Sequence, residues 1–181
     1  MKNTINEASL LDEILPHYDV SASYSIRIKS NPEKIFSILS QGVPTGTITR
    51  LLMLLRGVPR LLQKTAPGPV PEEAFYRLKE LKNREVVIGI VGQFWKPVSC
   101  PLPIHSLQEF LDFQKNGYCK AALNLRILPQ ESGECIVKTE TRVLGYGSAK
   151  EHFRQYWQLI GPFSGMIRKE ILRKIRKKAE G

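Results

Sequence analysis

The sequence predicts an α+β protein in which a curved antiparallel β-sheet wraps around one long C-terminal α-helix. Ahead of that helix, the residue patterns are mostly those of β-strands. Over residues 150–180, apolar residues recur instead at helical spacing. This stripe consists of Phe153, Tyr156, Trp157, Ile160, Phe163, Ile167, Ile171 and Ile175. So wide a stripe needs a large partner surface, and a curved sheet that provides it leaves room for a hollow.

One domain is expected for residues 1–181, because the composition, 42% hydrophobic and 24% charged, is ordinary for a globular unit. Residues 1–16 are expected to be an N-terminal leader with a short amphipathic helix that ends at Pro16. Residues 45–72 are expected to be a helical insert. Its helix over residues 48–64 is apolar almost all the way round, so something should cover it. It is a core helix that plugs the open side of the sheet, a lid over a pocket, or a partner-binding helix.

Local patterns predict the remaining elements. Alternation over residues 19–29 predicts a strand with one buried face, and Ser30 or Asn31 before Pro32 favours a helix start. A short helix carrying Phe110 is expected, as are strands at 75–81, 85–95, 121–127 and 135–143, the last two joined by a hairpin turn at Gly133. The polar residues of the last two strands are expected to form an exposed cross-strand ladder: Asn124, Arg126, Glu140 and Arg142.

Three segments carry a resemblance to a known superfamily. DVSASYSIRIKSNPEKIFSIL looks like its first strand and helix, GYCKAALNLRILP and ECIVKTETRVLGYG look like its last two strands, and FRQYWQLIGPFSGMIRKEILRKIRKKAE looks like the closing helix of a bacterial branch. The chain from about Asp19 onward thus resembles the helix-grip fold of the START-like superfamily, also called Bet v 1-like or SRPBCC. The resemblance is specific for the fold and not for the activity, because the superfamily has no universal catalytic motif.

The resemblance implies a hydrophobic cavity between the sheet and the last helix. Members of the superfamily bind lipids, sterols, polyketides, plant hormones or quinones, and some are cyclases, dehydratases or iron-carrying ring-hydroxylase subunits. Small-molecule pockets are mostly apolar with a few polar contacts. The expected ligand-binding residues are therefore Tyr24, Met53, Phe94, Trp95, Phe110, Tyr118, Leu123, Leu125, Thr139, Thr141, Tyr156, Trp157 and Ile160.

The sequence gives little support for catalysis or a metal site. His17, His105 and His152 stand alone, without acidic partners at ligand spacing, so no metal is expected, and no motif calls for a cofactor. The best general base is Glu140, but strand parity points it away from the apolar face. It would become catalytic only if that parity were reversed by one residue.

The cysteines and the charge bear on compartment and partners. Cys100, Cys119 and Cys135 are widely spaced and odd in number, which favours a reducing compartment. With no apolar signal segment or membrane span, a cytoplasmic protein is expected. The formal net charge is +10, and half of it lies in residues 168–181, with seven basic and two acidic residues. Basic residues suit a helix C-terminus. They would also suit weak contact with an anionic membrane, whereas no motif indicates nucleic acid.

The sequence is compatible with three functions. The first is a carrier or sensor that encloses a small hydrophobic molecule (a lipid, polyketide, quinone or similar) without catalysis. The second is an enzyme of the cyclase or dehydratase type acting in the same cavity, which predicts an inward carboxylate, histidine or arginine with a shifted pKa. The third is an interaction protein whose basic helix end meets anionic lipid or a protein, with salt-dependent binding.

Overall fold

The computed structural model describes residues 8–41, 75–96 and 101–181. Within these ranges, six strands form one antiparallel sheet in the order β1-β6-β5-β3-β2, with β4 paired to β3. The strands are β1 (Val20–Ile28), β2 (Tyr76–Leu81), β3 (Glu85–Gly92), β4 (Pro101–Leu102), β5 (Cys119–Pro129) and β6 (Cys135–Gly145). The helices are α1 (Leu10–Ile14), α2 (Pro32–Ser40), α4 (Leu107–Asp112) and α5 (Ala149–Glu180).

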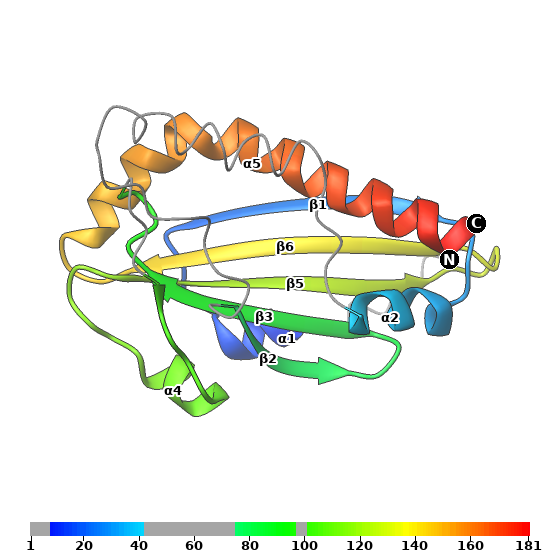
Figure 1. Cartoon of the computed structure of the whole chain (residues 1–181), viewed down its shortest axis with the longest axis horizontal. Helices are drawn as coiled ribbons and strands as arrows, with labels where there is room; N and C mark the ends of the chain where they lie inside the picture. Colours follow the sequence, from blue (N-terminus) through cyan, green and yellow to red (C-terminus); the bar gives the residue numbers. More distant parts are fainter. Residues whose placement is uncertain (1–7, 42–74, 97–100) are drawn as a thin grey trace, which may run out of the picture.

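The predicted helix-grip architecture is confirmed. The long helix α5 runs along the sheet and packs chiefly on β1 and β6, while α2 lies at one end between α5 and β5 (Figure 1). Pro162 lies inside α5, which stays helical through it, and the helix changes direction along its N-terminal half (Figure 1). Ser148 precedes the helix as expected, but its side chain makes no capping hydrogen bond. The insert expected over residues 45–72 lies outside the described residues.

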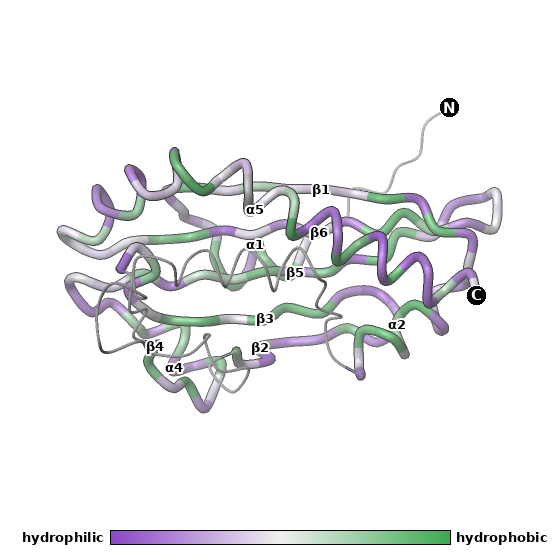
Figure 2. The backbone as a smooth tube through the Cα atoms, turned by 45° about the horizontal axis from the view of Figure 1, so that its top comes forward, coloured by the Kyte–Doolittle hydropathy of each residue, from purple (hydrophilic) through white to green (hydrophobic). Residues whose placement is uncertain are grey.

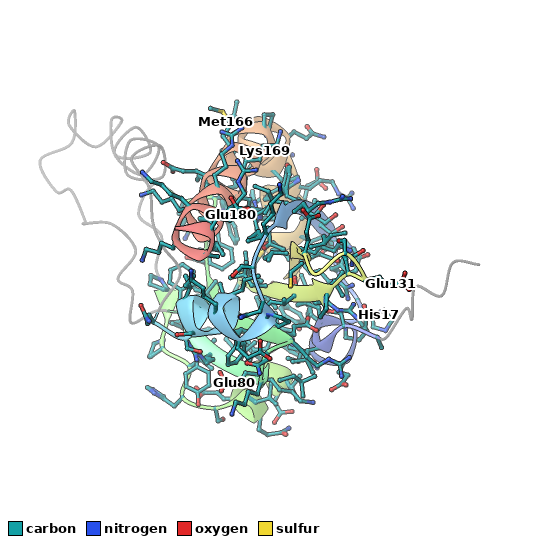
Figure 3. All side chains as sticks on the ribbon, turned by 90° about the vertical axis from the view of Figure 1, so that its right-hand side faces the viewer. His17, Glu80, Glu131, Met166, Lys169 and Glu180 are labelled. Carbon is teal, nitrogen blue, oxygen red and sulfur yellow. The ribbon has the colours of Figure 1, made fainter. Side chains whose placement is uncertain are left out.

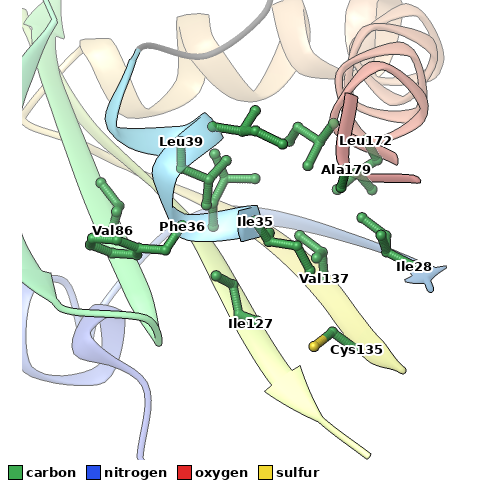
Figure 4. Close-up of a cluster of buried hydrophobic side chains, with 13 residues drawn as sticks. Ile28, Ile35, Phe36, Leu39, Val86, Ile127, Cys135, Val137, Leu172 and Ala179 are labelled. Carbon is green, nitrogen blue, oxygen red and sulfur yellow. The ribbon is translucent and has the colours of Figure 1, made fainter. Parts of the chain in front are cut away.

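We call the side of the sheet that meets α5 the inner face. On β1 the alternation predicted from sequence is observed: Tyr24, Ile26 and Ile28 face inward, and the serines between Val20 and Ile26 are exposed. At one end of this face, α2 and the end of α5 close over the strands in an apolar cluster (Figure 4). Burial of this cluster fixes α2 against the sheet, since each large buried side chain contributes about 1.5–3 kcal/mol. Its largest members include Ile28, Ile35, Leu39, Leu125, Ile127, Leu172 and Ile175.

The other side, which we call the outer face, is covered by α1 and α4. Leu10, Leu11 and Ile14 of α1 pack with Phe110 of α4 in a second cluster on β3 and β5. Figure 3 shows the two sides end-on, with the helix near His17 (α1) and the helix ending at Glu180 (α5) on opposite sides of the sheet. Residues 10–14 are therefore an integral part of the fold, and the chain forms a helix–sheet–helix sandwich.

This covering corrects one expectation. The ladder on β5 and β6 was expected to be exposed, but Asn124 and Arg142 are buried under α1. Asn124 Nδ2 donates to Glu85 Oε1 (2.7 Å) and to the Ser9 hydroxyl (2.9 Å), and Ser9 is the N-cap residue of α1. Buried polar groups need such partners, because an unsatisfied one is costly. The ladder is thus a buried hydrogen-bond network that fastens α1 to the sheet.

Short sequence signals set the connections as predicted. Asn31 caps α2 by accepting a hydrogen bond from the Lys34 N–H at 2.8 Å, with Pro32 in the first turn. The hairpin between β5 and β6 turns at Gly133, whose φ of 76° lies in the region that glycine tolerates best. Strand β3 ends at Gly92 rather than continuing to residue 95.

The two strands next to each other at one side of the sheet differ in polarity. In Figure 2, β3 is apolar along its length, whereas β2 is largely hydrophilic. All residues of β3 except the partly buried Ile88 are buried, while β2 lies at the edge of the described sheet. The pairing of β2 with β3 also shifts by one residue between Arg77 and Lys79, as in a β-bulge.

Candidate functional site

One row of side chains in the middle of the inner face is incompletely covered by α5. Ala22, Thr141, Leu123 and Ile88 are register partners across β1, β6, β5 and β3, and by strand alternation all face α5. Thr141 is buried, but the other three are only partly buried, although β5 and β3 are interior strands of the sheet. We call these four residues the central row.

The rows on either side of the central row are more completely buried. Their members on β3, β5 and β6 are all buried, and only their β1 members, Tyr24 and Val20, are partly buried. The buried members are Thr139, Leu125 and Val86 on one side, and Val143, Ala121 and Ile90 on the other. Each flanking row belongs to a separate apolar cluster. Among the described rows of the interior strands β3 and β5, the central row is therefore the one whose side chains are least completely buried.

A buried arginine borders this row from α5. Arg168 is 8% exposed, and its Nε donates a hydrogen bond to the Thr141 hydroxyl at 3.1 Å. One terminal nitrogen, Nη1, donates to the Ser164 carbonyl at 3.1 Å and to the Ser164 hydroxyl. In the described ranges, no carboxylate forms an ion pair with Arg168, and no group accepts a hydrogen bond from its other nitrogen, Nη2.

The electrostatics of Arg168 follow from this environment. Loss of water lowers the pKa of its guanidinium, and nearby Tyr24 opposes the shift. An arginine nevertheless stays protonated in proteins, so the site holds a buried positive charge. Its planar fork matches a carboxylate or phosphate, and it cannot accept a proton as a general base would.

The helix comes unusually close to β1 beside this arginine. A Cβ atom on Gly165 would overlap the Tyr24 hydroxyl. The glycine lets the tyrosine ring pass under the helix, one turn from Arg168. Thr141 of β6 and Ser164 of α5 thus bring hydroxyl groups to the guanidinium, and the Tyr24 hydroxyl of β1 lies against α5 one turn away.

An aromatic group lies at the other end of the inner face. Phe153 of α5 packs edge-on against Phe94 with ring centroids 6.2 Å apart, and it also meets Tyr156 and Trp157. The Trp95 ring stacks on His152 at 5.9 Å. These contacts are favourable aromatic geometries. They also place four of the expected ligand-binding aromatics in one cluster beyond the central row.

Most of the expected ligand-binding residues lie between α5 and the sheet. Tyr24, Leu123, Leu125, Thr139 and Thr141 share the inner face of neighbouring strands, whereas Ile160 is half-buried on α5. Met53 lies outside the described residues. By sequence, Arg168 is placed only within the basic helix end and is not predicted as a site residue. The signal was its position in the buried stripe of α5, four residues after Ser164 and four before Leu172.

Two expected ligand-binding residues lie on the outer face rather than between α5 and the sheet. Phe110 is fully buried in the outer-face cluster, and Tyr118 packs edge-on against Phe113 at 6.1 Å, beside the same cluster. The physical reason is that residues 107–112 form α4 on the outer face. Their aromatic character predicted burial correctly but could not indicate which face they would cover.

The other candidate catalytic groups are engaged elsewhere. Glu140 faces outward, where its Oε1 accepts a hydrogen bond from Arg142 Nε at 2.8 Å. Buried Lys120, also on the outer face, donates to the Phe110 and Leu111 carbonyls and so caps the end of α4. Burial lowers the pKa of Lys120, and nearby Asp112 opposes this shift. No group of three metal-ligating side chains occurs in the part of the chain that was described.

The outward side of α5 is mixed in character. Leu159 and Met166 are 72% and 48% exposed, and basic residues follow them toward the helix end. Met166 points away from the sheet (Figure 3), whereas the Lys169 ammonium lies 5.7 Å from the centroid of the Tyr24 ring. No helix in the described ranges has the length and apolar character needed to cross a membrane.

Comparisons with known proteins yield distant structural neighbours. No protein-family profile and no curated protein matches the chain. Truncated norcoclaurine synthase from Thalictrum flavum has a TM-score of 0.43 at 10% identity, covering 88% of this chain and 91% of that one. A hypothetical protein from Helicobacter pylori has a TM-score of 0.46 at 9% identity, covering 99% of both chains. Similarity this low carries no argument about activity, and the likeness to the START-like superfamily remains a resemblance.

Proposed function

We propose that this chain binds a small, largely apolar molecule between α5 and the sheet, as a carrier or sensor without catalysis. The observation that supports the proposal is the partly exposed central row in the middle of an otherwise buried interface. Apolar side chains left accessible inside a helix–sheet interface are stabilised when an apolar ligand covers them. The aromatic cluster around Phe153 supplies a further apolar wall at one end.

The residues near the row favour binding over acid–base catalysis. In the described chain, the buried polar side chains between α5 and the sheet are Thr139, Thr141 and Arg168. Arg168 does have a shifted pKa, which the enzyme alternative required. A guanidinium can stabilise a negative charge, but it does not exchange protons near neutral pH. Turnover of a bound compound by the Arg168 site would be the result that favours the enzyme.

The test uses a fluorescent lipid, cis-parinaric acid, and its uncharged methyl ester. Leu123→Trp places an indole over the central row and should weaken binding of both forms by about tenfold or more through steric exclusion. Leu128→Trp is the matched control, because Leu128 is a half-buried leucine of the same strand that faces the opposite side. It should bind as the wild type does.

Two outcomes would overturn the proposal. One is a wild-type protein that binds neither form saturably, and the other is equal binding by wild type and Leu123→Trp. Native mass spectrometry of gently purified protein provides an independent check. A co-purified small molecule that is lost in Leu123→Trp and retained in Leu128→Trp would support the proposal.

Contact with an anionic membrane is a second proposal for the same protein. It is supported by the exposed Leu159 and Met166 on a helix that continues into a basic end. Amphipathic helices of this kind bind at lipid interfaces, and their basic residues add salt-dependent attraction. Co-sedimentation with phosphatidylserine vesicles should fall as salt rises and should exceed that with phosphatidylcholine vesicles. Equal sedimentation with both vesicle types would contradict it.

A further inference from the structure

We propose that the ligand carries an anionic head group, a carboxylate or a phosphate, which pairs with Arg168 while its apolar body lies along the central row. This inference rests on the proposed function, since it names the chemical class of the molecule that would occupy the interface. It assigns Arg168 of α5 as the residue that selects this class.

The first argument is the set of partners around Arg168. Only neutral groups, the Thr141 hydroxyl and the Ser164 carbonyl and hydroxyl, accept its hydrogen bonds within the described structure. Those bonds use Nε and Nη1 and leave Nη2 without an acceptor there. A buried charge with no opposite charge destabilises a fold, so its presence calls for a partner. A bound anion would supply both the charge and the missing acceptors.

The second argument is position. Arg168 bonds to Thr141, and Thr141 is itself a member of the central row. On the same row, Leu123 and Ile88 of the adjacent strands are partly exposed. The cation and the accessible apolar surface are therefore neighbours, as the head and the body of one amphipathic molecule require. A wholly apolar guest would cover the leucine and isoleucine but would leave the guanidinium without a counter-charge.

The third argument is the chemistry of the surrounding hydroxyls. Tyr24 lies against Gly165 one turn from Arg168, and Thr141 and Ser164 lie on either side of the guanidinium. Hydroxyl groups donate to anionic oxygens as readily as they accept from arginine. A carboxylate or phosphate could thus accept hydrogen bonds from Nη2 of Arg168 and from two or three hydroxyls, with no rearrangement of the backbone.

The test compares cis-parinaric acid with its methyl ester, at a pH above 7 where the acid is ionised. The wild type should bind the acid roughly tenfold to a hundredfold more tightly, the range expected for a charge-assisted hydrogen bond. Arg168→Met should abolish this preference while retaining binding of the ester. Arg173→Met is the matched control, since Arg173 is an exposed arginine of the same helix. It should leave the preference unchanged.

Competition experiments distinguish the possible sources of the anion. Dodecanoate or dodecyl phosphate should displace the probe, whereas dodecanol should compete weakly. Inorganic phosphate and acetate should not displace it at comparable concentrations, because they lack the apolar body. Displacement by inorganic phosphate as effective as that by dodecyl phosphate would overturn the inference in favour of a simple anion site.

Failure of this inference differs from failure of the proposed function. If the wild type binds acid and ester equally, Arg168 does not select an anion, although ligand binding itself stands. If neither form binds, both ideas fail. Should Arg168→Met fail to fold, Thr141→Val and Arg168→Lys replace it, since each perturbs the fork and keeps the charge. Either variant should lower the ratio of acid affinity to ester affinity by about threefold or more. An unchanged ratio in both variants would overturn the inference.

Discussion

Two arginines on opposite faces of the same sheet are equally buried but differently surrounded. Arg142 and Arg168 are each 8% exposed. Arg142 donates to Glu140 and to Asp12 at 2.8 and 2.6 Å, and to two carbonyls of the α1 segment at 3.2 Å. Arg168 has hydroxyl and carbonyl partners only in the described chain.

The contrast extends to their proton affinities. Burial alone would lower the pKa of Arg142, but hydrogen bonds to Glu140 and Asp12 outweigh it and raise that pKa. For Arg168, burial dominates and the pKa is lowered. The same residue type thus fastens a helix where carboxylates surround it, whereas on the inner face it is a buried charge with no carboxylate partner among the described residues.

Removal of the Arg142 guanidinium should cause the largest loss of stability. Arg142→Met leaves Glu140 with the longer 3.7 Å pair to Lys138. It also leaves Asp12 without its hydrogen-bonded cation and removes the bonds to α1, so the free energy of unfolding should fall by about 3–5 kcal/mol. Urea denaturation measures this loss. Arg27→Met is the control, because Arg27 is exposed with a distant ion pair of 3.6 Å, and it should change stability by less than about 1 kcal/mol. A loss below about 1 kcal/mol for Arg142→Met would contradict the comparison.

Substitution of Gly165, where α5 lies close to Tyr24, should cause the second-largest loss of stability. Gly165→Ala forces a methyl group against the Tyr24 hydroxyl and should destabilise by about 1–3 kcal/mol, measured by thermal unfolding. Adding Tyr24→Phe should recover part of the loss. Gly161→Ala serves as the control, since beyond its chain neighbours its Cβ would meet only ordinary contacts at 3.5 Å or more. The helix preference of alanine is opposed there by Pro162, which disfavours a helical residue with a Cβ before it, so the net change should stay below about 1 kcal/mol. Equal changes in stability for the two glycine substitutions would contradict the close approach of α5 to Tyr24.

Removing the unenclosed arginine should have the opposite sign to removing Arg142. Arg168→Met takes a charge out of a buried site, so the ligand-free protein should gain about 1 kcal/mol of stability. Calorimetric melting of delipidated protein measures the gain, with Arg173→Met as the exposed control. A loss of more than about 2 kcal/mol would mean that Arg168 is a structural residue like Arg142.

The smallest expected effect is the contribution of Asp12 to the pH dependence of stability. Hydrogen bonding to Arg142 is the main cause that lowers the pKa of Asp12. A carboxyl with a lowered folded-state pKa adds stability above its unfolded pKa of about 3.9, and this stability is lost as pH falls through the folded pKa. Wild type should therefore exceed Asp12→Asn by about 0.5–1 kcal/mol at pH 7, because Asp12 is half exposed, and the gap should close in strong acid. A gap independent of pH would contradict this origin.

The sequence predicts more of the fold than of the candidate site, and single residues show the physical reasons. Alternation on β6 predicted that Thr139 and Thr141 face inward and Glu140 faces outward, because successive side chains of a strand point to opposite faces of the sheet. Alternation could not tell that α1 would cover Asn124, since a five-residue helix gives no sign of the face on which it packs. Arg168 lay on the buried stripe of α5, but the general rule that arginines are exposed outweighed that position.

The edges of the sheet have a consequence for self-assembly. In the described sheet, β1 forms one edge and presents Ser21, Ser23 and Ser25 to water, while β2 forms the other edge. Strand β2 combines its shifted pairing with the charged Arg77 and Lys79. Polar, charged and irregular borders discourage further strands from adding to a sheet. These borders therefore disfavour the association of copies of this chain through their sheet edges, and with it fibrous aggregation.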